Sequence, residues 1–260
     1  MRNSRFLFLG IMMFGCVVGC GHKAEVGAPV AAPTIPAQAE KVVAPETVSE
    51  LPSTPVKVPQ KKGKKYAVEG TSTRAIQELD DRIDAYIINP KNDEERAFNA
   101  NLKRSIIHGI FDVSELCRQA LDKHWATLAE ADQKSFVDLM TRLLEKKGIF
   151  SKEQDNHKGT DGKYFVTYEG DKFLSPEKTL SLVNTHVHIP KENLSIELNY
   201  KMRRSAEWKI FDVIVDQASL LDNYKYQFDK IISKDGYPEL YKRMSAKLQD
   251  MEAKEKKKTE

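Results

Sequence analysis

The sequence predicts an α+β fold in which an antiparallel, four-stranded meander sheet is covered on one face by several α-helices. Apolar residues recur at helical spacing before residue 148 and after residue 219, and strand-like segments lie between these regions. Residues 194–202 alternate between apolar and polar side chains, which is typical of a strand with one solvated face. The segments 190–193 and 203–207 are short enough to be hairpin connections.

The helices before the sheet are predicted from apolar stripes at spacings of three and four residues. We expect helices over 73–88, 93–108, 111–125 and 127–147. The first ends before Pro90, because the residue preceding a proline disfavours the helical conformation. Asp112 stands at the start of the third segment, where a carboxylate can accept from free N–H groups, so we expect it to cap that helix.

The strands are expected over 164–168, 179–189, 194–202 and 208–215, and the last is dense in β-branched and aromatic residues. Ser219 then occupies an N-cap position, and Asp222 completes a weak capping box. The helix that follows has the apolar stripe Leu220, Tyr224, Phe228 and Ile231. Gly236 and Pro238 separate it from a final helix.

The first 20 residues predict a bacterial lipoprotein signal peptide. Arg2 and Arg5 precede an apolar run over 6–18 that is too short to span a bilayer as a mature helix. The run ends in Val-Val-Gly-Cys, so we expect lipidation at Cys20 and a periplasmic domain anchored to a bacterial membrane, inner or outer. The alternative is a plain secretory signal with incidental cysteines.

Residues 21–68 predict a disordered tether rich in alanine and proline. A segment with so few aromatic residues buries too little apolar surface to offset its ordering entropy. Residues 69–250 are then expected to form one folded domain, and residues 251–260 a charged tail. Cys117 is the one cysteine within the folded domain, and we expect it to be a small buried hydrophobe.

The composition and motifs favour a binding protein over an enzyme. A net charge of +3 is too small to indicate nucleic-acid binding. His186 and His188 share a strand face, but ligands spaced to complete a zinc site are missing from the sequence, so we expect neither a metal nor a cofactor. Asp112 and Asp212 each follow a phenylalanine, and a structural role as cap or acceptor is favoured over general-base catalysis.

Two blocks of residues resemble a known family. The strand-to-helix block reads Phe211-Asp212-Val213, Ser219-Leu220, Asn223-Tyr224 and Phe228. The helical block reads Phe111-Asp112, Leu121, Trp125, Gln133 and Phe136. Both are similar to the MlaC-like periplasmic phospholipid-binding proteins, the auxiliary or toluene-tolerance component of a lipid-transporting ABC system.

The resemblance implies an apolar pocket between sheet and helices that holds phospholipid acyl chains. The residues expected to line it are Phe136, Met140, Leu143, Val187, Ile196, Leu198, Tyr200, Met202, Phe211, Val213, Val215 and Tyr224. It further implies a carrier that passes phospholipid between an ABC- or MCE-type transporter and an outer-membrane partner complex. The apolar faces by themselves are equally consistent with a filled core. A carrier for another hydrophobic ligand, such as a sterol-like molecule, and a small α+β enzyme are the alternatives.

Overall fold

The computed structural model describes residues 65–87, 89–147, 164–190 and 193–259. All of them belong to one compact unit of the chain. The predicted lipidation site Cys20 and the predicted tether up to residue 64 lie outside the described residues.

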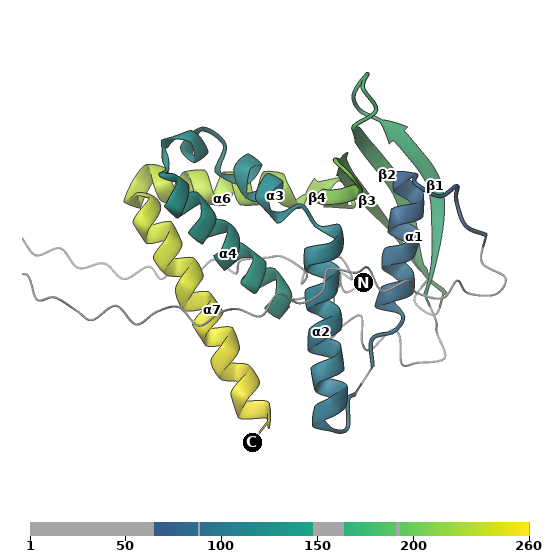
Figure 1. Cartoon of the computed structure of the whole chain (residues 1–260), viewed down its shortest axis with the longest axis horizontal. Helices are drawn as coiled ribbons and strands as arrows, with labels where there is room; N and C mark the ends of the chain where they lie inside the picture. The colour runs from purple at the N-terminus through teal and green to yellow at the C-terminus, as the bar shows by residue number, and fades with distance from the viewer. Residues whose placement is uncertain (1–64, 88, 148–163, 191–192, 260) are drawn as a thin grey trace, which may run out of the picture. The chain divides into compact units, whose positions relative to one another are not determined.

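The elements occur in the predicted order of helices, strands and helices (Figure 1). The helices are α1 (Ser72–Ile83), α2 (Asp93–Ile110), α3 (Val113–Leu121), the 3-10 helix η3 (Asp122–Thr127), α4 (Glu130–Lys147), α6 (Leu220–Asp235) and α7 (Tyr237–Thr259). The strands are β1 (Phe165–Phe173), β2 (Leu180–Ile189), β3 (Leu194–Arg204), β4 (Trp208–Val215) and β5 (Ala218–Ser219).

The sheet is an antiparallel meander in the order β1-β2-β3-β4-β5, so it has five strands and not the predicted four. The chain turns at Asp216 and Gln217, which both have positive φ, and the two residues of β5 then pair with the end of β4. A strand of two residues is too short to show any periodicity, which is why the sequence pattern missed it.

The first strand is longer than predicted and continues to Phe173. Its pairing with β2 is interrupted by a bulge between Tyr168 and Gly170. Gly170 has a φ of +99°, a conformation that glycine adopts without a steric penalty. The bulge breaks the alternation of side chains, and the strand signal ends there in the sequence.

Two predicted helices end earlier than their apolar stripes indicate. α1 ends at Ile83 because the side-chain amide of Asn99 bonds both the N–H and the C=O of Ile87, which holds that segment out of a helix. α3 ends at Leu121 because Asp122 has a φ of +45°, outside the helical region. Trp125 therefore lies on η3 and not on the predicted continuous helix.

The two predicted caps are confirmed, Asp112 at the start of α3 and Ser219 at the start of α6. Asp112 accepts from the N–H of Glu115 at 2.9 Å, and Ser219 accepts from the N–H of Asp222 at 3.0 Å. Asp212 is fully buried and accepts from the N–H of Leu221 at 3.0 Å, so it ties β4 to the start of α6. These contacts make both aspartates structural groups.

The helices contact different strands of the sheet. α1 packs on β1 and β2, whereas α2, α3 and α6 pack on β4 (Figure 1). α4 packs on α2, α3 and α7. The helices of the described residues are all too short or too polar to cross a membrane.

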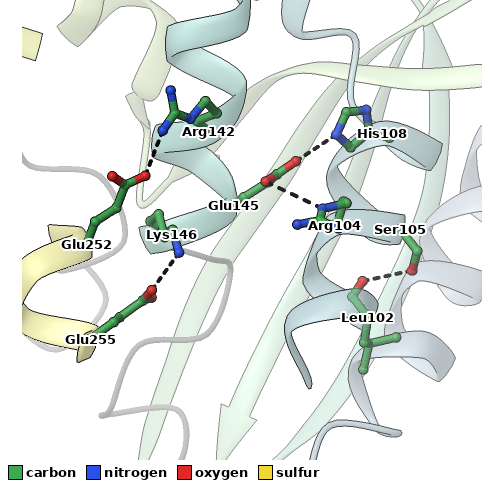
Figure 2. Close-up of polar contacts among 9 residues, drawn as sticks. All are labelled: Leu102, Arg104, Ser105, His108, Arg142, Glu145, Lys146, Glu252 and Glu255. Atoms are coloured by element: carbon green, nitrogen blue, oxygen red, sulfur yellow. Dashed lines mark hydrogen bonds and ion pairs between the residues drawn. The ribbon is translucent and has the colours of Figure 1, made fainter. Parts of the chain in front are cut away.

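Ion pairs join α4 to the helices on both sides of it (Figure 2). Glu145 pairs with His108 of α2 at 2.7 Å and with Arg104 at 3.8 Å. On the other side, Arg142 and Lys146 pair with two glutamates of α7 at 2.8 and 2.6 Å. Most of these side chains are solvent-exposed, so each pair contributes only about 0–1 kcal/mol.

Candidate functional site

One apolar cluster lies on the sheet, at the end formed by the β2–β3 hairpin. We call it the sheet cluster: Val187, Ile189 and Ile196 are buried, and Tyr164, Val166, Leu194, Leu198 and Val215 pack against them while staying partly exposed. The antiparallel register places these side chains on one face, since Val187 pairs with both Val166 and Ile196, and Leu198 pairs with Val215.

The partly exposed members leave apolar surface of the sheet cluster accessible. A filled core leaves little apolar surface accessible, but five of these eight side chains keep some exposure next to buried neighbours. Such a surface gains free energy from any apolar ligand that covers it, at roughly 25 cal/mol per Å² removed from water. The sheet cluster therefore forms an accessible apolar wall.

The predicted lining residues of the sheet fall along this wall and beyond it. Val187, Ile196, Leu198 and Val215 belong to the sheet cluster. Tyr200 and Val213 pair with each other on the same face, farther along the strands. Met202 pairs with Ile210 and is fully buried, and the neighbouring Phe211 is the extra residue of a bulge in β4. These last positions belong to the closed part of the core.

The predicted lining residues on helices pack into a helical core. Phe136 of α4 contacts Phe228 edge-to-face with ring centroids 5.7 Å apart, and Tyr224 stacks on the same ring at 5.3 Å. Met140 and Leu143 are also buried on α4. Phe228 thus connects Phe136 of α4 to Tyr224 of α6. The twelve predicted residues thus fall into a sheet group and a helical group.

Four members of the sheet cluster were missed from the sequence: Tyr164, Val166, Ile189 and Leu194. All four lie in segments that the sequence predicts as strands. Tyr164 and Val166 are spaced by two and share a face with Val187, which is the signal that could have found them. Ile189 and Leu194 flank the hairpin and pair with each other.

A carboxylate of α1 lies against the tyrosines of this sheet face. Asp80 accepts a hydrogen bond from the hydroxyl of Tyr168. Burial raises the pKa of Tyr164 to about 12, with a further contribution from the charge of Asp80. Burial and the same charge also raise the pKa of Tyr200 and Tyr168. The three hydroxyls stay protonated at neutral pH, so they serve as hydrogen-bond donors and not as nucleophiles.

A pocket of about 330 Å³, with several charged residues in its lining, lies between η3 and α6. Lys123 and His124 both bond Asp229 at 2.8 Å, and Lys123 with His124 holds the pKa of that carboxyl at about 2. A carboxylate with so low a pKa is a poor general base at neutral pH. Its lining within the described residues offers no hydroxyl or thiol nucleophile other than the phenol of Tyr226.

The two strand histidines lie on the face opposite the sheet cluster. His186 pairs with Glu169 at 3.0 Å, and His188 bonds the hydroxyls of Thr167 and Ser195 at 2.9 and 3.2 Å. Among residues 65–259 that the structure describes, no group of three or more histidine, cysteine, aspartate or glutamate side chains is placed to hold a metal ion.

Comparison with known proteins gives a family match and similar solved structures. A family model described as MlaC protein matches residues 77–246, from the middle of α1 into α7. A solved structure of a phospholipid-binding protein from Ralstonia solanacearum, in complex with a phospholipid, is similar with a TM-score of 0.54 and 18% sequence identity. The similarity covers 68% of this chain and 96% of that chain. No curated protein matches the chain.

Proposed function

Because this chain belongs to the MlaC family, we propose that it binds phospholipid and carries it within the bacterial cell envelope. The family match confirms the resemblance that the two sequence blocks predicted. The related fold of the phospholipid-bound Ralstonia protein supports this proposal. Binding of this kind requires no catalytic residue, in keeping with the structural roles of Asp112 and Asp212.

The sheet cluster is the observation that carries the proposal. It offers apolar side chains from β1, β2, β3 and β4 on one face, and several of them stay accessible. Each methylene that moves from water onto such a surface contributes about 0.8 kcal/mol, so acyl chains bind without a specific polar contact. The protonated hydroxyl of Tyr164 can donate to an ester oxygen of a lipid, whereas the single proton of the Tyr168 hydroxyl is already donated to Asp80.

We further propose that the carrier is anchored through a lipid on Cys20 and swings on the tether. A flexible segment of about 45 residues has a root-mean-square span of roughly 40 Å, which gives the domain access to partners near the anchoring membrane. The partners implied by the family are an ABC- or MCE-type lipid transporter and an outer-membrane complex. Loss of labelled fatty acid incorporation in Cys20→Ser tests the anchor, and shortening the tether should impair transfer while leaving lipid affinity unchanged.

Native mass spectrometry of the purified chain, followed by extraction and identification of its ligand, tests the function. Co-purified phospholipid is the expected result. A different apolar ligand, such as a sterol-like molecule, would replace phospholipid as the cargo while keeping the wall as its site. A chain that neither co-purifies nor takes up phospholipid from vesicles would refute the proposal.

Two matched variants locate the ligand on the wall. Leu198→Asp places a charge within the sheet cluster, whereas Leu182→Asp places the same charge on the opposite face of the sheet. Both side chains are partly buried, so the two changes perturb the sheet comparably. We expect at least a tenfold loss of lipid affinity for Leu198→Asp alone, about 1.4 kcal/mol or more. Equal losses in both variants would place the ligand elsewhere.

A further inference from the structure

Three large apolar side chains are exposed at the end of the sheet opposite the sheet cluster. Val68, Phe173 and Leu174 are 77%, 45% and 45% exposed, and we call them the apolar tip. Trp208 connects these segments, because its ring stacks on that of Phe173 with centroids 6.4 Å apart and its Nε1 donates to the carbonyl of Gly70, two residues after Val68, at 3.0 Å. The tip thus combines residues from before α1, from β1 and from the turn that follows β1.

The tip is an ordered projection and not a frayed end. The turn between β1 and β2 extends past the start of α1 (Figure 1). Ser175 accepts from the N–H groups of Thr179 and Leu180 within this turn, and the N–H of Leu174 donates to the carbonyl of Leu180 at 2.9 Å. Side chains on a projecting turn do not form the groove that a peptide or a helix requires. The tip is better suited to contact a broad, deformable apolar surface than to bind a peptide or a helix.

Cationic side chains lie over the aromatic rings of the tip. The Nζ of Lys178 is 5.6 Å from the ring centroid of Phe173, and the guanidinium of Arg204 is 5.8 Å from that of Trp208. An aromatic ring with a long cationic side chain above it suits the interfacial region of a bilayer, where rings sit among headgroups and cations reach phosphates.

The charges around the tip show which force would drive binding. The basic side chains Lys172, Lys178 and Arg204 are balanced by the acidic side chains Glu69, Glu177 and Glu207. Among the residues that the structure describes, the tip therefore carries no excess positive charge, and its own side chains contribute little attraction to anionic lipid. Insertion of the apolar side chains must supply the affinity, so binding should depend only weakly on salt.

We propose that the apolar tip inserts into the headgroup region of a lipid bilayer and docks the domain there. At about 3.3 Å per residue, β2 separates the tip from Val187 and Ile189 of the sheet cluster by roughly 20 Å or more. Docking therefore leaves the wall free of the membrane surface. The inference concerns membrane contact alone and stands or falls independently of the cargo.

The two tryptophans of the chain provide the measurement. Trp208 lies at the tip, whereas Trp125 lies on η3 among the helices. The full-length chain carrying Trp125→Phe reports only Trp208, and the chain carrying Trp208→Phe reports only Trp125. With vesicles of brominated phosphatidylcholine, we expect fluorescence quenching of Trp208 and not of Trp125. The comparison is repeated in the Cys20→Ser variant, because a lipid on Cys20 would be connected to the domain next to Val68 and could itself bring the tip toward the membrane.

A pair of matched variants tests which side chain inserts. Leu174→Asp changes the tip, and Phe98→Asp makes a similar change at a 46% exposed site on α2. In the Trp125→Phe background, Leu174→Asp should lower the partition coefficient of the protein between water and vesicles about tenfold. Phe98→Asp should leave that coefficient unchanged. Equal quenching of the two tryptophans, or equal effects of the two variants, would overturn the proposal. Unchanged thermal unfolding of both variants confirms that the domain stays folded.

Discussion

The contacts of Asp212 indicate that the strand-to-helix block stabilises the fold, and substitution of this residue tests that role. Its carboxylate is fully buried and lies 3.0 Å from the Nζ of Lys201. It also accepts from the hydroxyl of Ser219 at 2.8 Å and from the N–H of Leu221 at 3.0 Å. The perturbation is Asp212→Ala, which removes all three contacts while adding no bulk.

The loss in the free energy of unfolding follows from the contacts that Asp212→Ala removes. Without the carboxylate, the N–H of Leu221 is left buried without its acceptor, which costs about 1–3 kcal/mol. Lys201, whose side chain is 31% exposed, loses its ion partner but can still reach water, so its penalty is smaller than for a fully buried charge. We expect a total loss of about 3–4 kcal/mol in the free energy of unfolding. For a domain of this size, that lowers Tm by roughly 10 °C.

Denaturant and thermal unfolding of the variant measure the effect, with lipid content determined on the same samples. Asp138→Ala is the control, because Asp138 is exposed on α4, and it should change stability by less than about 0.5 kcal/mol. A loss below about 1 kcal/mol for Asp212→Ala would refute the reasoning. A stable variant that no longer binds lipid would instead make Asp212 a ligand-binding residue.

Three further predictions concern titration, reactivity and backbone conformation. The folded-state pKa of Tyr164, about 12, exceeds its ordinary value of 10. The contribution of this group to the free energy of unfolding is therefore fully present below pH 10 and is lost as the pH rises toward 12. Unfolding curves across that range measure this loss, and a flat profile would contradict it. Burial raises the pKa of the Cys117 thiol, so a thiol reagent should modify it only at the rate of unfolding, and rapid labelling of the native protein would show it to be accessible. Gly236 ends α6 with a φ of +82°, so Gly236→Ala should cost about 1 kcal/mol in chemical unfolding, and an unchanged midpoint would contradict the strain.

The regular part of the fold was predictable because its signals are local. The alternation of β3 placed Ile196, Leu198 and Tyr200 on one face, and the structure keeps them there. The caps Asp112 and Ser219 were predictable because a cap acts within one turn of its own helix. The irregular features were not: the bulge at Gly170 and the two-residue β5 have no periodicity to detect.

The candidate site was predictable only in part. Half-exposed Leu198 and fully buried Met202 stand on the same face of one strand and look alike in the sequence. Likewise, Phe136 and Tyr224 fit an apolar wall by periodicity, but both pack on Phe228. How much surface each residue keeps depends on which element lies over it, and that is a property of the assembled layers.

By itself, the sequence determined the α+β class, the order of elements, the caps and the family, since each of these depends on spacing along the chain or on residues that recur in fixed order. The tertiary structure alone decided which apolar residues form the closed helical core and which form the accessible sheet cluster. It also brought Phe173 and the segment at Gly70 together at Trp208, although these three parts of the chain are far apart in the sequence. Exposure is a collective property of packed neighbours, and no local pattern contains it.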